Sequence, residues 1–524
     1  GMPEYLSPGV YIEEFEIGAK PMEGVSTSTA GFLGETERGP TTPCLITSWL
    51  QYQRVFGGYF GNDKYLPGSV DGFFKNGGKR CYISRIVKAG DKPATTASLK
   101  LKVNGENALT VEAVGEGEWG TRVAVQISRG TFSGFRLDVF YWKVKPASLY
   151  NPYKETRTQP RPAGVESFDN VSIDEASPDH FEKTVNGISN FVKIMIKEGD
   201  SAELLNTPES LLELEYLADG SDGEGDFVLS DYERSAPEDD KPGKRKGLTA
   251  LKGIEDISII YAPNAYSVSG LVGSLISHCE SLRYRFAILD APQGSSNVSD
   301  LDPRSNKPEG SIPTDFAAFY YPWIKVINPE TGMLQVIPPG GYVAGVYARS
   351  DTTRGVHKAP ANEVVLGASD LEFQIMKGEQ DILNPRGVNV IRAFPGRGIR
   401  IWGARTISSN TLWKYINVRR LFIFIEASIE RGTQWVVFEP NDERLWARVK
   451  ATINQFLTGV WRSGALMGTT PEEAFFIKCD RSTMTQDDID NGRLICIIGI
   501  APVKPAEFVI FRIAQWQGGS AATE

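Results

Sequence analysis

The chain has 524 residues, of which 41% are apolar and 23% charged, and its formal net charge is −9. This length exceeds what one hydrophobic core supports, so we expect roughly two to four domains, with little long-range disorder. The acidic balance leaves no polybasic footprint for nucleic acid or anionic membrane, and no apolar run reaches the roughly 18 residues that span a bilayer. Without a visible secretory signal, we expect a soluble cytosolic product.

The five cysteines are scattered, and none is spaced as C-x-x-C. They are Cys44, Cys81, Cys279, Cys479 and Cys496. Reduced buried thiols explain this pattern better than a disulfide or a metal site. Because the three histidines do not cluster with them, we expect no metal and no cofactor.

Short strands separated by Gly and Pro turns are predicted in the first 90 residues. Residues 5–17 form an extended arm in which Pro8-Gly9 breaks any helix. Strands follow at 30–34, 44–47 and 81–87, which gives a compact first module.

The composition changes between residues 91 and 246. Strands are predicted at 99–103, 109–114 and 123–128, within a β-rich insertion. Polar stretches rich in Gly, Pro, Asp and Lys follow, and the segment 219–246 is most simply a solvated loop. We therefore expect the whole segment 91–246 to lie outside the core.

Residues 254–292 are predicted to form a β-α-β unit. Apolar runs at 257–261 and 286–290 are typical of strands, and the spacing of Leu271, Leu275, Ile276 and Leu282 indicates a helix between them. A strand, a helix and a strand within this distance predict a parallel pair with a crossover.

The last third has the most regular pattern. The apolar spacing from Val418 to Ile429 predicts one helix, and Asn441 or Asp442 can cap a second. The expected buried stripe of the second helix is Leu445, Val449, Ile453, Phe456 and Val460. Strands are predicted at 474–479, 494–503 and 508–513, and residues 517–524 are expected to be disordered.

Three sequence patterns suggest a catalytic or ligand-binding site, but we interpret none of them as such a site. Residues 115–120 read G-E-G-E-W-G, but the two glutamates would repel a pyrophosphate and a strand is predicted to follow, so we predict a turn. The acidic run 219–226 lacks the ordered ligand positions of a calcium loop. His278 lies in a predicted helix, no G-x-S-x-G elbow is present, and we predict a structural role for this histidine.

Several distinctive segments occur along the chain. Near the N-terminus they are L-S-P-G-V-Y-I-E-E at 6–14 and G-F-L-G-E-T-E-R-G-P at 31–40. The most distinctive is G-I-R-I-W-G-A-R-T at 398–406, followed by Y-I-N-V-R-R-L at 415–421 and F-E-P-N-D at 438–442. In this order, the segments resemble those of contractile phage tail sheath proteins. The resemblance covers about 5–90 and 210–515, whereas about 130–210 matches nothing.

This resemblance implies a multidomain α/β and α+β fold. A C-terminal α+β core domain would be completed by the N-terminal segment, the middle would be subtilase-like without catalysis, and a β-rich insertion would point outward. The implied division is 1–20 extended arm, 21–90 N-terminal body, 91–210 variable insertion, 211–395 subtilase-like middle region, 396–507 C-terminal core, and 508–524 arm strand and tail.

The implied function is structural, not enzymatic. Subunits would assemble as stacked six-fold rings around an inner tube and contract to drive that tube through a target envelope. The implied partners are other copies of the chain, the tube protein, and baseplate and terminator proteins, in a virion tail or injection particle assembled in the bacterial cytoplasm. A subtilase-like hydrolase and a static tube or shell protein stay open as alternatives.

Both chain ends carry strand-like segments that are set off from their domains by Pro or Gly. A strand that is apolar on both faces must be covered on both, and donation to a neighbour's sheet would do so. The expected inter-subunit contacts are Val10, Tyr11, Ile12, Phe15, Phe508, Val509, Ile510, Phe511 and Ile513. Burial of each strand within its own domain is the alternative.

Overall fold

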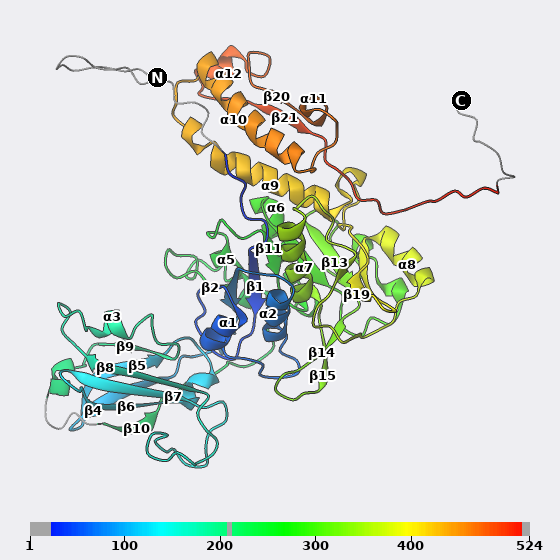
Figure 1. Ribbon diagram of the computed structural model, residues 1–524. Helices are drawn as coiled ribbons and strands as arrows, with labels where there is room; N and C mark the ends of the chain where they lie inside the picture. The colour runs from blue at the N-terminus through cyan, green and yellow to red at the C-terminus, as the bar shows by residue number, and fades with distance from the viewer. Residues whose placement is uncertain (1–21, 207–211, 516–524) are drawn as a thin grey trace, which may run out of the picture. The chain divides into compact units, whose positions relative to one another are not determined.

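The computed structural model of the chain describes residues 22–206 and 212–515 (Figure 1). The chain divides into two compact units. The body unit is Gly24–Val356 with Pro360–Ser428, and the terminal unit combines Gly1–Glu23, His357–Ala359 and Ile429–Glu524. The predicted N-terminal arm at 5–17 and the predicted disorder at 517–524 lie outside the described residues.

A nine-stranded sheet forms the core of the body unit, in the order β16-β19-β18-β13-β12-β11-β1-β3-β2. Its six central strands are parallel: β1 (Ala30–Gly34), β3 (Cys81–Arg85), β11 (Ile259–Tyr261), β12 (Phe286–Asp290), β13 (Ala317–Tyr321) and β18 (Val388–Phe394). The antiparallel strands β2 (Cys44–Ile46), β19 (Gly398–Ile401) and β16 (Glu363–Val364) close its edges. Most residues of the central strands are buried, which explains why these strands read largely as continuous apolar runs.

The predicted β-α-β unit is confirmed. β11 and β12 pair in parallel, and α6 (Leu271–Leu282) makes the crossover between them. The strands predicted at 30–34, 44–47 and 81–87 are also present, as β1, β2 and β3.

Glycines let two helices of the body unit pack closely. They are α2 (Leu66–Lys75) and α7 (Gly340–Thr353). A Cβ atom on Gly341 would stand 2.4 Å from the Ser69 carbonyl oxygen, and one on Gly345 would stand 2.5 Å from the Phe73 carbonyl oxygen. Both distances are far below van der Waals contact, so the packing requires residues without side chains at these positions.

The β-rich insertion consists of two antiparallel sheets. One has the order β10-β6-β7-β8 and the other β4-β5-β9. Their bounds are β4 (Ser98–Val103), β5 (Glu106–Ala113), β6 (Val123–Arg129), β7 (Phe135–Tyr141), β8 (Gly164–Val171), β9 (Val192–Met195) and β10 (Leu212–Tyr216). The three strands predicted from the sequence are confirmed, and a hydrophobic core of their own, with Trp119 and Leu137 fully buried, holds the sheets together.

The prediction that the whole of 91–246 lies outside the core is wrong at its C-terminal end. Tyr232 of α4 (Leu229–Glu233) is only 8% exposed and belongs to the core of the nine-stranded sheet. Phe227 and Leu229 pack against that core as well. This short helix was hidden because the polar residues around it dominate the composition.

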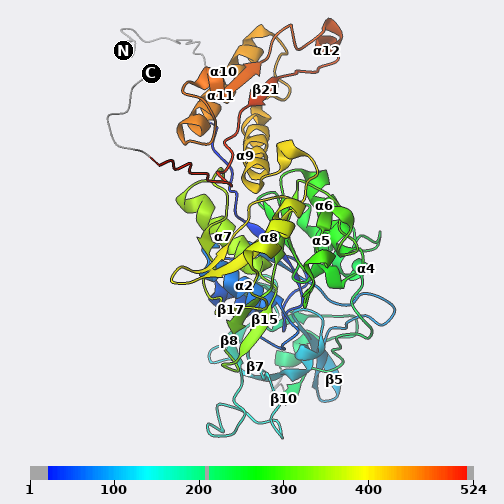
Figure 2. The same ribbon diagram turned by 90° about the vertical axis from the view of Figure 1, so that its right-hand side faces the viewer.

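The terminal unit contains the C-terminal helices and a small sheet. Helix α9 (Ile416–Gly432) begins in the body unit and ends in the terminal unit, where α10 (Glu443–Arg462) follows. Asp442 caps α10 by accepting a hydrogen bond from the Leu445 backbone N–H at 2.9 Å, and all five residues of the predicted stripe are buried. The two-stranded sheet of β20 (Phe475–Lys478) and β21 (Ile497–Ile500) lies beside α10 in both views (Figures 1 and 2).

The remaining elements are short. A three-stranded sheet of β14 (Ile324–Ile327), β15 (Leu334–Ile337) and β17 (Asp370–Leu371) belongs to the body unit. Other helices are α1 (Trp49–Phe56), α3 (Phe181–Thr184), α5 (Gly247–Leu251), α8 (Lys377–Leu383), α11 (Pro471–Ala474) and α12 (Gln486–Asp490). None of the helices within 22–206 and 212–515 combines the length and the apolar character needed to cross a membrane.

Candidate assembly surfaces

The C-terminal segment 505–515 is extended and pairs with no strand among the described residues. The strand predicted at 508–513 is therefore absent from the single chain, because a strand requires a partner edge. Its predicted contact residues are all exposed, by 70% at Phe508, 66% at Val509, 74% at Ile510, 83% at Phe511 and 93% at Ile513. Five large apolar side chains in one short run form a surface that water solvates poorly.

The four predicted contact residues at the other end of the chain are Val10, Tyr11, Ile12 and Phe15. They lie outside the described residues. The structure therefore places the C-terminal half of the predicted site and leaves its N-terminal half as a prediction.

A groove of about 430 Å³ lies between β20 and α10. Its floor includes Ala447 and Ala451 of α10, and its wall includes Phe475, Phe476 and Ile477 of β20. Within the described part of the chain, β20 pairs only with β21. The other edge of β20 is thus open, and the small side chains of α10 leave room beside it.

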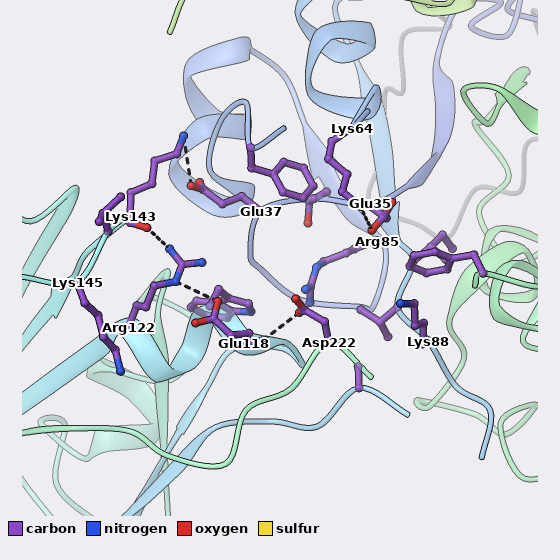
Figure 3. Close-up of a pocket in the computed structure, with 18 of the residues that line it drawn as sticks. Glu35, Glu37, Lys64, Arg85, Lys88, Glu118, Arg122, Lys143, Lys145 and Asp222 are labelled. Carbon is purple, nitrogen blue, oxygen red and sulfur yellow. Dashed lines mark hydrogen bonds and ion pairs between the residues drawn. The ribbon is translucent and has the colours of Figure 1, made fainter. Parts of the chain in front are cut away.

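A second, charged cleft of about 850 Å³ lies in the body unit (Figure 3). Glu35 and Glu37 follow β1, and Arg85 ends β3, so all three stand at the carboxyl ends of neighbouring parallel strands. Lys143 and Glu118 come from the insertion.

Ion pairs satisfy most of the charge in this cleft. Lys64 Nζ lies 2.9 Å from Glu35 Oε1, and Arg122 Nε lies 3.2 Å from Glu118 Oε2. Lys143 of the insertion pairs with Glu330 and lies 3.5 Å from Glu37. The ion pairs along this cleft therefore connect the insertion to the nine-stranded sheet.

Two buried arginine side chains strengthen this connection. Burial lowers the pKa of Arg85 to about 10, against the opposing pull of Glu116 and Asp222, and its Nη1 donates to the Gly39 carbonyl at 3.0 Å. Arg38 is 6% exposed, and its guanidinium carbon lies 4.5 Å from the ring centre of Phe191 in the insertion. Both arginines remain cationic at neutral pH, so they hold acidic and aromatic groups of the insertion in place.

The motifs that suggested chemistry have structural explanations. Residues 115–120 form a turn that leads through a 3-10 helix (Glu118–Arg122) into β6, which confirms the predicted turn. His278 is buried on α6, where its Nε2 accepts a hydrogen bond from Arg285 Nη1 at 2.8 Å, a contact that agrees with the predicted structural role. Among the described residues, no three His, Cys, Asp or Glu side chains gather as metal ligands would.

Sequence reasoning missed both the groove and the charged cleft. The cleft could have been found, because Glu35 directly after strand 30–34 and Arg85 at the end of strand 81–85 meet once those strands are recognised as parallel neighbours. The groove could not, since it depends on how α10 and β20 pack against each other in space, which the apolar pattern of neither element specifies.

Two family models match adjacent parts of the chain. The phage tail sheath protein central domain covers 240–407, and the phage tail sheath C-terminal domain covers 408–515. The chain is 27% identical to the tail sheath protein of Burkholderia phage BcepMu over 244 residues, which is 43% of this chain and 50% of that protein. It is 26% identical to the tail sheath protein of Vibrio phage KVP40 over 177 residues, 33% of this chain and 26% of that protein. The matches thus span half or less of these two relatives.

Solved structures extend the likeness in fold to nearly the whole chain. The contracted helical sheath of the anti-feeding prophage aligns with a TM-score of 0.59 at 23% identity, covering 97% of this chain and 99% of that one. The contracted sheath complex of the extracellular contractile injection system PVC aligns with a TM-score of 0.57 at 23% identity, covering 98% and 99%.

The class of protein follows from these observations. The molecule is a mixed α/β multidomain protein with the fold of contractile sheath subunits. The chain belongs to the contractile phage tail sheath family. The matched proteins are structural components of phage tails and injection systems.

Proposed function

We propose that this chain is the structural subunit of a contractile sheath. Copies would assemble as stacked six-fold rings around an inner tube and contract to drive the tube through a target envelope. The observation that carries the proposal is the exposed apolar segment 508–513, in a chain with the fold of sheath subunits. The family match gives the hydrolase alternative no support.

The C-terminal segment has the properties of a donated strand. Its residues 508–513 pair with no strand within the described chain, and they carry large exposed apolar side chains. Adding it to a sheet edge would form backbone hydrogen bonds worth about 1 kcal/mol net each and would bury apolar side chains worth about 1.5–3 kcal/mol apiece. We propose the same role for Val10, Tyr11, Ile12 and Phe15.

The groove between β20 and α10 is the proposed acceptor. A two-stranded sheet alone is marginally stable, and β20 presents an unpaired edge among the described residues. Phe476 is 52% exposed on that strand, and Ile497 is 47% exposed on β21. A strand from a neighbouring subunit would cover this apolar surface and enlarge the sheet.

Strand exchange suits a machine that shortens. A link made of backbone hydrogen bonds at one small sheet can persist while the larger body units repack against one another. Subunits would then move without dissociating. The energy released on contraction would reside in contacts between body units.

Residues 211–395 are the proposed subtilase-like middle region. Parallel strands β11, β12, β13 and β18, with α6 as a crossover, are the features of the sheet that support this comparison. Its proposed role is to supply bulk and contacts, and the insertion would point outward from the sheath.

The proposed partners are other copies of the chain, an inner tail tube protein, and baseplate and terminator proteins. One solved relative is described as part of the anti-feeding prophage baseplate, refined with six-fold symmetry. Assembly in the bacterial cytoplasm, within a virion tail or an injection particle, completes the proposal.

Electron microscopy of the concentrated full-length chain tests it. We expect hollow tubes with six-fold symmetry, and no tubes from a variant that ends at Lys504. Particles that stay unassembled in all salts would contradict the proposal. Tubes that form from the truncated variant would exclude the C-terminal segment as the link between subunits.

A further inference from the structure

Two cysteines face each other at one end of the β20–β21 sheet. Cys479 directly follows β20, and Cys496 directly precedes β21. Lys478 pairs with Ile497 in the antiparallel register, so the next position along the ladder places Cys479 opposite Cys496. Each thiol also shifts the pKa of the other.

This placement suits a disulfide. Directly opposite residues of an antiparallel pair have Cα atoms about 4.5–5.5 Å apart, within the range of about 4.4–6.8 Å that disulfides span. Both thiols are free in the structure. The register therefore indicates a separation that a disulfide can span.

We propose that Cys479 and Cys496 form a reversible disulfide that locks the β20–β21 sheet. The oxidant is a small-molecule disulfide such as oxidised glutathione. The Cys496 thiolate attacks one sulfur of the oxidant, which forms a mixed disulfide and releases one glutathione thiolate. Cys479 then loses its proton and attacks Cys496 Sγ, which expels the second glutathione. The two protein thiols are oxidised, and one oxidised glutathione is reduced to two thiols.

The surroundings decide which thiol reacts first. Cys479 is 5% exposed, whereas Cys496 is partly exposed. Burial raises the pKa of Cys479 to about 12. Burial also raises the pKa of Cys496, but the Cys479 thiol and the Lys450 ammonium oppose that increase. Cys496 is thus the better nucleophile, and exchange is expected to become faster as the pH rises.

The bond would join the two strands of a sheet that has no third strand among the described residues. It would close the connection 480–495 and restrict the unfolded chain. In its effect on assembly the inference rests on the proposed function, because the same sheet is the proposed strand acceptor. Formation of the bond itself does not depend on assembly.

The chain provides its own control pair. Cys44 and Cys81 lie on the paired strands β2 and β3, but Ile46 is opposite Cys81 and Cys44 is opposite Ile83. They are therefore diagonal neighbours, a relation in which Cα atoms lie about 7–8 Å apart. This separation exceeds the disulfide range, so the pair should not bridge.

The test treats the full chain with oxidised glutathione at mildly alkaline pH, followed by non-reducing peptide mapping. Trypsin cuts after Lys478, Arg481 and Arg493, so the two cysteines fall on separate peptides that only the disulfide joins. We expect a bridged Cys479–Cys496 peptide that dithiothreitol separates, and a rise of at least about 4 °C in the melting temperature of the terminal unit.

Cys479→Ser and Cys496→Ser should each abolish the bridge and the temperature shift, while Cys44→Ser should preserve both. A stable glutathione adduct on Cys496 without a bridge would overturn the inference, as would a bridge between two chains. The inference would also be overturned if both thiols of the folded chain stayed unmodified while the urea-unfolded chain formed the bridge under the same conditions. These outcomes are independent of whether tubes form.

Discussion

Arg420 and Asp351 form a buried ion pair between α9 and α7. Arg420 Nη1 lies 2.9 Å from Asp351 Oδ1 and Nη2 lies 2.6 Å from Oδ2, and their side chains are 3% and 5% exposed. Thr27 completes the arrangement, because its hydroxyl donates to Asp351 Oδ2 at 2.7 Å and its carbonyl accepts from Arg420 at 2.9 Å. Three distant segments of the body unit therefore meet at one pair of charges.

Removing one charge of this pair should be strongly destabilising. Asp351→Ala leaves the Arg420 guanidinium buried without its counter-ion, so we expect a loss of about 3–5 kcal/mol. Asp381→Ala is the matched control, because its pair with Lys377 is 61% and 83% exposed and should contribute less than about 1 kcal/mol. Chemical denaturation measures both. Similar losses in the two variants would contradict the argument.

His278 makes the body unit sensitive to acid. Burial lowers its pKa to about 3, and the neighbouring Arg285 and Lys252 act in the same direction. Between about pH 6.5 and that value, the unfolded chain binds a proton that the folded chain does not. The contribution of this site to the free energy of unfolding is therefore fully present above about pH 6.5. It declines as the pH falls, by up to about 5 kcal/mol.

His278→Gln tests this linkage. A glutamine oxygen can accept the Arg285 hydrogen bond but does not titrate. We expect tube formation to be retained and the melting temperature to fall less than in the native chain between about pH 7 and pH 4.5. Cys279→Ser on the same helix keeps the histidine and should keep the acid sensitivity. Peptidase or esterase turnover that either change abolished would overturn the structural role of this helix.

At the scale of elements, local patterns predicted local structure well. Helix α10 was predictable because its cap and its apolar stripe are both encoded within twenty residues, and Asp442 and Leu445 occupy the expected places. The strand predicted at 494–503 is shorter, Ile497–Ile500, because only these residues pair with β20. Residues 508–513 show the limit of this reasoning, since their strand pattern is clear but no partner edge lies within the described chain.

The C-terminal segment can be tested without deleting it. Ile510→Asp with Phe511→Asp places charges on side chains that are 74% and 83% exposed in the single chain. Folding should change by no more than about 0.5 kcal/mol, because neither side chain is buried. In an assembled sheet both charges would be desolvated, so association should weaken by more than about 100-fold.

Phe132→Asp is the matched control for this variant, because Phe132 is 89% exposed on the insertion. It should leave both folding and tubes unchanged. Circular dichroism reports folding, and sedimentation reports assembly. If the double variant unfolds, the segment belongs to its own domain, and strand donation is wrong.

At the scale of the whole molecule, the insertion joins the rest of the body unit through two adjacent chain segments. Thr95 bridges to Ser221, and Ser98 bridges to Ala218. Just outside them, the Glu224 backbone N–H donates to the Lys92 carbonyl at 3.1 Å. The chain thus enters and leaves the insertion at nearly the same place, and the core of the insertion is separate from that of the nine-stranded sheet.

These features define a deletion that the body unit should tolerate. Replacing residues 95–221 with a short Gly/Ser linker removes the strands of the insertion and their core, and the linker spans only a few ångströms. The melting temperature should fall modestly, because Arg38 loses Phe191 and the charged cleft opens. Tubes should still form if the insertion points outward from the sheath.

The longer deletion of residues 91–246 is the matched control, and it should fail. It also removes Tyr232, which is packed in the core, and Asp231, whose Oδ1 accepts the Ala89 backbone N–H at 2.9 Å. Loss of one large buried aromatic side chain alone costs about 3–5 kcal/mol, so this variant should aggregate or unfold where the shorter deletion does not. Thermal melting and electron microscopy compare the two. A shorter deletion that folds but forms no tubes would place the insertion in the interface between subunits, and its outward position would then be wrong.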